Sequence, residues 1–145
     1  GRVLYTLKDQ GFLYLFRRLI MADTAYLAIL YLCNEKCEFC PCSKDEKKEG
    51  LITPFEEIKD VVDIFIEKGI KEIVISGGEP TLHPQLINIL NYIQKHNMKI
   101  VLLSNGEMFA SEKFLNRFAT TVNMSELTVI TTLHSHIESK HEAAN

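Results

Sequence analysis

The chain of 145 residues lacks an excess of basic side chains, a long apolar run, and any cysteine outside one short segment. Its 16 Lys and Arg residues against 19 Asp and Glu residues give a net charge of −3, whereas nucleic acids and anionic membranes select strongly basic surfaces. Charges such as Arg17 and Arg18 interrupt each apolar stretch well before the roughly 18 residues that a membrane span requires. We therefore expect a cytoplasmic protein with no nucleic-acid partner and no membrane segment.

All four cysteines, Cys33, Cys37, Cys40 and Cys42, lie within ten positions of one another, so none is left for a long-range disulfide. Clustering of this kind favours a metal or an inorganic cluster over a secreted disulfide framework. Hydrophobic residues make up 46% of the chain and charged residues 24%, which is typical of an ordered globular domain. No low-complexity tract is visible.

Hydrophobic spacing divides the chain at about residue 24. Before that point the apolar residues recur at helical spacing, with Arg17 and Arg18 on the other side. These apolar residues are Phe12, Leu15, Phe16, Leu19 and Ile20. We therefore predict a lead-in helix within residues 1–24 and one α/β domain over residues 25–145.

Four short apolar runs, at residues 25–32, 71–76, 99–104 and 127–133, alternate with three amphipathic segments. Each run has the pattern of a strand buried on both faces. Helix start signals occur at Thr53, where Thr-Pro-Phe-Glu resembles a capping box, at Pro84, and at Ser111. The predicted inward faces are Phe55, Ile58, Val61, Val62 and Phe65, then Leu86, Ile89, Leu90 and Ile93, then Phe114, Leu115 and Phe118.

This βαβαβαβ order predicts parallel strands with helical, right-handed crossovers. A complete eight-unit barrel typically needs about 250 residues, so the predicted fold is a partial (β/α) TIM-like barrel of about four strands and three crossover helices. A half barrel leaves residues 127–133 as an apolar edge, which soluble proteins usually cover. We therefore expect an excerpt of a longer protein, or a partner that pairs with this edge.

Small, polar or cysteine-rich segments follow the end of each predicted strand, at residues 33–42, 77–80, 104–106 and 132–135. Parallel α/β sheets form their active sites at this rim, so the four segments should converge. Cys33-x3-Cys37-x2-Cys40 offers three thiolates, which favour zinc or iron and sulfide. An iron–sulfur cube usually takes four cysteines, so three would leave one iron open to another ligand. A structural zinc site that uses all four thiols is the alternative.

Gly77-Gly78-Glu79-Pro80 combines two residues that permit close approach to the backbone with a carboxylate and a rigid turn. A carboxylate here suits an ammonium group. The alternative is a plain strand-to-helix turn in which Glu79 is solvated.

Together these two motifs resemble those of the radical S-adenosylmethionine (SAM) superfamily. That family carries a Cys-x3-Cys-x-aromatic-Cys loop after its first strand, and here Phe39 precedes Cys40. Its Gly-Gly-Glu-Pro segment follows the second strand, unchanged at residues 77–80. The resemblance covers residues 25–135, the front half of the family's (β/α)6 partial barrel.

The resemblance implies that Cys33, Cys37 and Cys40 bind a [4Fe–4S] cluster, whose remaining iron takes the amine and carboxylate of SAM. It implies that Phe39 shields the cluster near the adenine. The cofactor-binding segment of Gly77, Gly78, Glu79 and Pro80 would receive the methionyl ammonium group. Ser104 and Asn105 lie in a turn that resembles the family's Thr-Asn-Gly, and Thr132 matches a hydroxyl residue that meets the ribose.

The implied reaction begins when an external donor of the flavodoxin or ferredoxin type reduces the cluster. Reductive cleavage of SAM then gives methionine and a 5′-deoxyadenosyl radical, which abstracts hydrogen from a substrate, as in an oxidoreductase or transferase. No protein side chain is assigned a catalytic role, because the cofactor supplies the difficult chemistry. Family analogy favours a peptide or protein substrate. Since the family's later strands are missing, full activity is not expected from these 145 residues alone.

Four residues remain outside this scheme. Cys42 is expected to be a bystander thiol, although an electron-transfer protein in which Cys42 completes the cluster is a second alternative. His83, directly before Pro84, is interpreted as a helix-start residue and not a ligand. For His134 and His136 a substrate-facing role and a solvated loop are both open.

Overall fold

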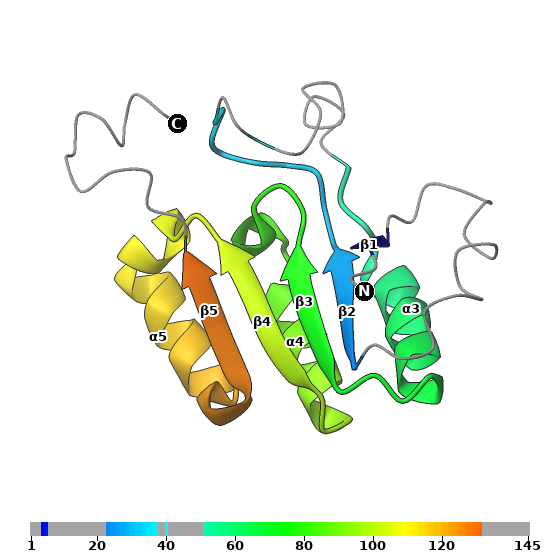
Figure 1. The fold of residues 1–145 in the computed structure, drawn as a ribbon. Coiled ribbons are helices and arrows are strands. Elements are labelled where there is room, and N and C mark those ends of the chain that lie inside the picture. The colour runs from blue at the N-terminus through cyan, green and yellow to red at the C-terminus, as the bar shows by residue number, and fades with distance from the viewer. Residues whose placement is uncertain (1–3, 6–22, 38–39, 41–50, 132–145) are drawn as a thin grey trace.

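The computed structural model describes residues 4–5, 23–37, 40 and 51–131 of the chain. Five parallel strands form one sheet in sequence order, with the predicted α/β alternation (Figure 1). The strands are β1 (Leu4–Tyr5), β2 (Thr24–Ala28), β3 (Glu72–Ser76), β4 (Lys99–Ser104) and β5 (Leu127–Thr131). The α-helices are α3 (Phe55–Glu67), α4 (Leu86–Lys95) and α5 (Glu112–Thr121). The 3-10 turns are η2 (Pro80–Leu82), η3 (Glu107–Ala110) and η4 (Met124–Glu126).

The core lies between the sheet and its helices. Alternate strand residues stand in rows across the sheet, as in the register Leu27↔Ile75 and Ile75↔Leu102. These residues belong to one buried cluster that also contains Phe65 of α3 and Phe118 of α5. Helices α3, α4 and α5 connect successive strands, so the strands run parallel and their carboxyl ends share one rim.

Helix α3 confirms the predicted inward face, since its buried residues are Ile58, Val61, Val62 and Phe65. The predicted cap is wrong: the N-cap is Pro54, without a side-chain hydrogen bond, so Thr53 lies one residue too early to cap. Glu56 accepts a 2.7 Å hydrogen bond from Lys59 instead of turning back to the cap. The helix is followed by Gly69, whose φ of +74° favours glycine.

Helix α5 begins as predicted, with Ser111 accepting a 3.5 Å hydrogen bond from the backbone N–H of Phe114. Phe118 is fully buried, but the prediction that Leu115 points inward is wrong, since its side chain is 44% exposed. Leu115 instead lines an open cavity together with Val129 and Thr131 of β5.

The N-terminal segment differs from the prediction in one respect. Residues 4 and 5 form β1, a short strand that pairs with β2 in parallel, and the helical spacing did not anticipate it. The predicted helix positions, residues 12–20, lie outside the described residues. The domain boundary near residue 24 stays a prediction, and β2 begins at Thr24.

At the opposite side of the sheet, the described residues pair β5 with β4 alone. Ile130 on this strand is 51% exposed, as expected for an apolar edge. Within the described ranges, no helix has the length and apolar character needed to cross a bilayer.

Candidate functional site

The Gly-Gly-Glu-Pro segment pairs with the backbone that leads into the first cysteine. The N–H of Gly78 donates a 2.8 Å hydrogen bond to the carbonyl of Leu30, and the N–H of Glu79 donates one of 2.8 Å to the carbonyl of Leu32. Both segments lie beyond the carboxyl ends of their strands, at one edge of the sheet (Figure 1). The structure therefore brings together the two motifs that the sequence places on successive strands.

The two glycines are required by this pairing itself. A Cβ atom on Gly77 would lie 2.2 Å from the carbonyl oxygen of Leu30, and one on Gly78 would lie 2.1 Å from that of Leu32. Gly77 also has a φ of +140°, which side-chain-bearing residues rarely adopt. The close approach that we expected from a ligand is thus made, in the described residues, by the protein's own backbone. Both glycines are half-buried.

The side chain of Glu79 is a buried hydrogen-bond acceptor, with only 1% of its surface exposed. Its Oε1 accepts from the Thr81 N–H at 3.0 Å, the Thr81 hydroxyl at 2.5 Å and the Ser104 hydroxyl at 2.8 Å, and its Oε2 accepts from the Asn105 N–H at 2.7 Å. The alternative of a solvated Glu79 is therefore wrong. A buried carboxylate is tolerated when donors satisfy it, and here they join the end of β3 to the end of β4.

Three cysteines of the predicted ligand set, Cys33, Cys37 and Cys40, are described, and all are half-buried. The Sγ of Cys33 accepts a 3.4 Å hydrogen bond from the N–H of Glu35, and the Cys37 thiol donates to Glu35 Oε2 at 3.4 Å. The N–H of Cys40 donates to the carbonyl of Cys37 at 3.4 Å, which folds the loop back on itself.

These thiols fit an iron–sulfur cluster by donor chemistry, because three soft ligands come from one loop of eight residues at the rim. In the part of the chain that the structure describes, no three His, Cys, Asp or Glu side chains are gathered closely enough to hold a metal ion. Ligation by all three thiols therefore requires the loop to close further.

A side-chain network fastens this loop to the turn after β4. Asn105 Nδ2 donates a 2.9 Å hydrogen bond to Asn34 Oδ1, and Asn34 Nδ2 donates to Glu107 Oε2. The N–H of Glu107 in turn donates to Asn105 Oδ1 at 3.1 Å. Our sequence analysis missed Asn34 and Glu107. Only their positions in the sequence could have indicated a role: Asn34 lies between two cysteines, and Glu107 follows the Ser-Asn-Gly turn.

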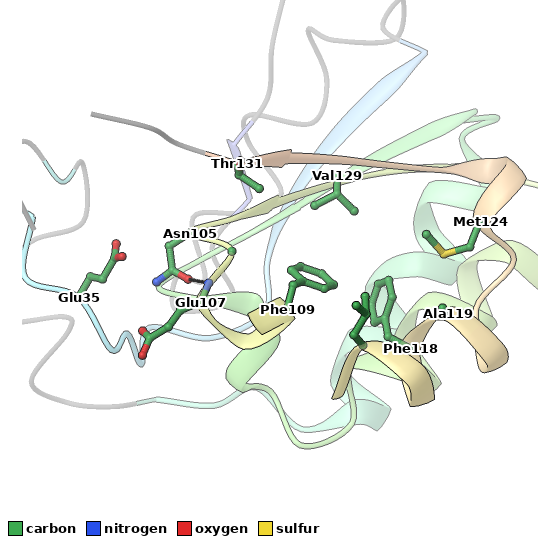
Figure 2. Close-up of a pocket in the computed structure, with 11 residues that line it drawn as sticks. Glu35, Asn105, Glu107, Phe109, Phe118, Ala119, Met124, Val129 and Thr131 are labelled. Carbon is green, nitrogen blue, oxygen red and sulfur yellow. Dashed lines mark hydrogen bonds between the residues drawn. The ribbon is translucent and has the colours of Figure 1, made fainter. Parts of the chain in front are cut away.

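A cavity of about 810 Å³ opens beside this network (Figure 2). Its polar end is formed by Glu35, Asn105 and Glu107, and its apolar end by the aromatic rings of Phe109 and Phe118 with their neighbours (Figure 2). The remaining lining residues are Gly106, Leu115, Ala119, Met124, Val129 and Thr131. The cavity therefore connects the cysteine loop to the open side of the sheet at β5.

His83 is a buried structural residue, but the prediction that it starts a helix at Pro84 is wrong, because His83 is the C-cap of η2 and α4 begins at Leu86 with Gln85 as its N-cap. Its side chain is 3% exposed, its Nε2 lies 2.9 Å from the carbonyl oxygen of Thr53, and its Nδ1 accepts a 3.1 Å hydrogen bond from the N–H of Gln85. Both contacts are satisfied by the neutral tautomer with the proton on Nε2. Burial lowers the pKa of His83 below its ordinary value, and the hydrogen bond to Thr53 only partly opposes this shift.

Five singled-out residues, namely Phe39, Cys42, Thr132, His134 and His136, lie outside the described residues. Their expected roles stay predictions.

The model of the "Radical SAM superfamily" matches residues 27–131, which include both motifs and all three crossover helices. The chain belongs to the radical SAM superfamily. This membership agrees with the parallel sheet and with the meeting of the cysteine and Gly-Gly-Glu-Pro segments at its carboxyl rim.

Two curated relatives illustrate the similarity. A probable GTP 3′,8-cyclase of Methanococcus maripaludis is 37% identical over 81 residues, which cover 55% of this chain and 27% of the relative. The antilisterial bacteriocin subtilosin biosynthesis protein AlbA of Bacillus subtilis is 30% identical over 88 residues, which cover 61% of this chain and 19% of the relative. The chain thus spans about a quarter or less of these proteins.

Among solved structures, Streptococcus suis SuiB bound to the precursor peptide SuiA matches with a TM-score of 0.65 and 18% identity. The match covers 79% of this chain and 25% of SuiB. At this identity the similarity supports the fold of the chain alone.

Proposed function

We propose that the chain is the cofactor-binding front half of a radical SAM enzyme barrel. Cys33, Cys37 and Cys40 would hold a [4Fe–4S] cluster, and SAM would bind beside it at the same rim. When bound, these groups supply the electron and the 5′-deoxyadenosyl radical that abstracts hydrogen from a substrate. The pairing of Glu79 with Leu32 supports this proposal most strongly, because it fixes the Gly-Gly-Glu-Pro segment next to the residue that precedes Cys33.

The contacts at the rim suggest different roles for the Glu79 carboxylate and for the backbone of Gly77 and Gly78. The Glu79 carboxylate is occupied by Thr81, Ser104 and Asn105, so we propose that it holds the backbone of Gly77 and Gly78 in place. The half-exposed backbone of the two glycines would then receive the methionyl ammonium group. In this arrangement the buried carboxylate contributes negative potential near that cation, while direct hydrogen bonds come from the main chain.

Further roles follow the family resemblance. Pro80 would fix the turn, since it starts η2 with its ring at the first position. Ser104 and Asn105 would position the cofactor side of the β4 turn, Phe39 would shield the cluster, and Thr132 would meet the ribose. Each of these is proposed for the chain as part of a longer barrel.

We also propose a location in the cytoplasm and an external one-electron donor of the flavodoxin or ferredoxin type. For the substrate we propose a peptide or protein. Two similar proteins support this class by their names: AlbA is a bacteriocin biosynthesis protein, and SuiB was solved with a precursor peptide.

The test is anaerobic reconstitution of the chain with iron and sulfide, followed by dithionite and SAM and quantification of 5′-deoxyadenosine. We expect the wild-type chain to release 5′-deoxyadenosine above the level of a Cys37→Ala variant treated in the same way. Equal, background amounts from both proteins would contradict the proposal.

A further inference from the structure

We propose that Asn34, Asn105 and Glu107 form a clamp that positions the cysteine loop for cluster binding. The inference deepens the proposed function and rests on it, because it assigns a role in cluster retention to two residues outside the ligand set. Asn34 and Glu107 are positioning residues in this account, since they act through the loop and not on the cluster itself.

The clamp is a closed ring of hydrogen bonds. The Asn34 amide uses both of its ends, accepting from Asn105 Nδ2 at 2.9 Å and donating to Glu107 Oε2. Glu107 closes the ring by donating its backbone N–H to Asn105 Oδ1 at 3.1 Å. Because Asn105 and Glu107 are 71 and 73 residues away from Asn34, the ring fixes a long-range relationship that local loop geometry does not provide.

The ring stands on a rigid support. Asn105 donates its backbone N–H to the buried Glu79 carboxylate at 2.7 Å, and Gly106 donates its N–H to the Ser104 hydroxyl at 3.0 Å. The Glu79 carboxylate at the end of β3 therefore fixes the position of the turn after β4. Asn34 connects this support to the peptide that follows Cys33, the first residue of the ligand set.

Holding the loop matters because of its ordering entropy. Three thiolates reach one inorganic core only if the intervening backbone is fixed, and each residue fixed costs conformational entropy. A loop that is already attached next to Cys33 loses less conformational entropy when it binds the cluster. Cluster assembly is therefore favoured, and cluster release is slowed. The ring is solvent-exposed and outside the hydrophobic core, so removing it should alter the loop and leave the global fold intact.

Two substitutions of Glu107 distinguish the effect of its hydrogen bond to Asn34 from the effect of its charge. Glu107→Ala removes the acceptor for Asn34, whereas Glu107→Gln keeps an acceptor oxygen and removes only the charge. Glu112→Ala is the matched control, because Glu112 is an exposed glutamate in the first turn of α5 and its carboxylate accepts no hydrogen bond from the described residues. Asn34→Ala removes this bond from the other side and also removes the bond from Asn105 Nδ2.

The experiment reconstitutes each variant anaerobically and follows cluster absorbance after addition of an iron chelator. We expect cluster loss to be about three- to tenfold faster in Glu107→Ala and Asn34→Ala, the scale of losing an ordinary hydrogen bond of about 0.5–1.5 kcal/mol. Glu107→Gln should fall near the wild type, and the double variant should lose its cluster no faster than Asn34→Ala alone, because Asn34→Ala already removes the bond to Glu107. Loss at the wild-type rate in Glu107→Ala, or additive effects in the double variant, would overturn the clamp.

A second measurement keeps this result separate from the proposed function. Amide hydrogen exchange of the chain without a cluster should be faster at residues 33–37 in Glu107→Ala than in the wild type or Glu112→Ala, with unchanged thermal unfolding. If the wild-type chain assembled no cluster, the proposed function would fail while hydrogen exchange still decided the clamp. Unchanged exchange at residues 33–37 would count against the clamp alone.

Discussion

The carboxylate of Glu79 accepts a 2.7 Å hydrogen bond from the backbone N–H of Asn105, 26 residues further along the chain. This bond ties the motif after β3 to the turn after β4, and the side chain of Asn105 continues the connection to Asn34 in the cysteine loop. Three segments that are far apart in the sequence thus form one hydrogen-bonded unit at the rim.

Substitution of Glu79 should destabilise the fold even without any cofactor. Glu79→Gln replaces one acceptor oxygen by an NH2 group that faces either the Asn105 N–H or the hydroxyl and amide donors around Oε1. A buried donor left without an acceptor costs about 1–3 kcal/mol, so we expect a loss of this size in urea unfolding. Ser104→Ala removes one donor only and should cost about 1 kcal/mol. An unfolding free energy of Glu79→Gln equal to that of the wild type would contradict the described network.

Alanine substitution should distinguish the glycines at the rim from the glycine after α3. At Gly78 the added Cβ would meet the Leu32 carbonyl oxygen at 2.1 Å, whereas at Gly69 it would meet nothing within 4 Å. We expect Gly78→Ala to lower the unfolding free energy by about 3 kcal/mol or more, as severe overpacking does. Gly69→Ala should cost only the left-handed backbone penalty of about 1–2 kcal/mol. Chemical denaturation of both variants measures the difference, and similar losses would refute the close approach of the two segments.

His83 should make the stability of the fold depend on pH. Burial lowers the pKa of its imidazole in the folded state, so the unfolded chain binds a proton more readily. Stability is therefore full well above the ordinary pKa near 6.5 and is lost as the pH falls through that value toward the lower folded pKa. Protonation would also place an N–H on Nδ1, against the N–H of Gln85.

Urea unfolding at pH 7.5 and 5.5 tests this dependence. We expect the wild type to lose stability at the lower pH by more than His83→Gln does. His96→Gln is the control for the substitution itself, because it replaces an exposed histidine at the end of α4. An identical pH dependence in the wild type and His83→Gln would exclude His83 as its source.

The exposed edge of the sheet should promote association of this chain with itself. Ile130 is 51% exposed on β5, and the structure shows no further strand beyond β5 within the residues it describes. We expect Ile130→Lys to reduce concentration-dependent association in sedimentation experiments while changing the unfolding free energy by about 0.5 kcal/mol or less. Thr120→Lys, which adds the same charge on α5, should leave association unchanged. Equal effects of the two substitutions would attribute the change to net charge and not to the edge.

The elements with strong apolar periodicity could be predicted from the sequence. Lys99–Ser104 was predicted to the residue, and the α3 face of Ile58, Val61 and Phe65 is buried as expected, because burial on a sheet follows the helical period directly. Leu115 fits the same period but is exposed, since α5 covers the last strand described. Periodicity indicates an apolar face, but it does not reveal whether a neighbouring element covers every residue on that face.

The sequence predicted that the cysteine and Gly-Gly-Glu-Pro motifs lie close together, but it did not predict the hydrogen bonds between their side chains and the turn after β4. Strand ends of a parallel sheet share one edge, which correctly brought Gly78 near the segment before Cys33. The hydrogen-bond partners of Glu79, and the links of Asn34 to Asn105 and Glu107, depend on side-chain directions between distant segments. No spacing rule within one segment encodes such contacts.

The most direct test of the account is the iron and acid-labile sulfide content of the chain after anaerobic reconstitution, compared with Cys37→Ala and Cys42→Ala. The account predicts about four iron and four sulfide per chain in the wild type and in Cys42→Ala, and neither in Cys37→Ala. Bound zinc without sulfide would instead support the zinc-stabilised module. Loss of the cluster in Cys42→Ala would contradict the three-cysteine site and favour an electron-transfer protein that uses all four thiols.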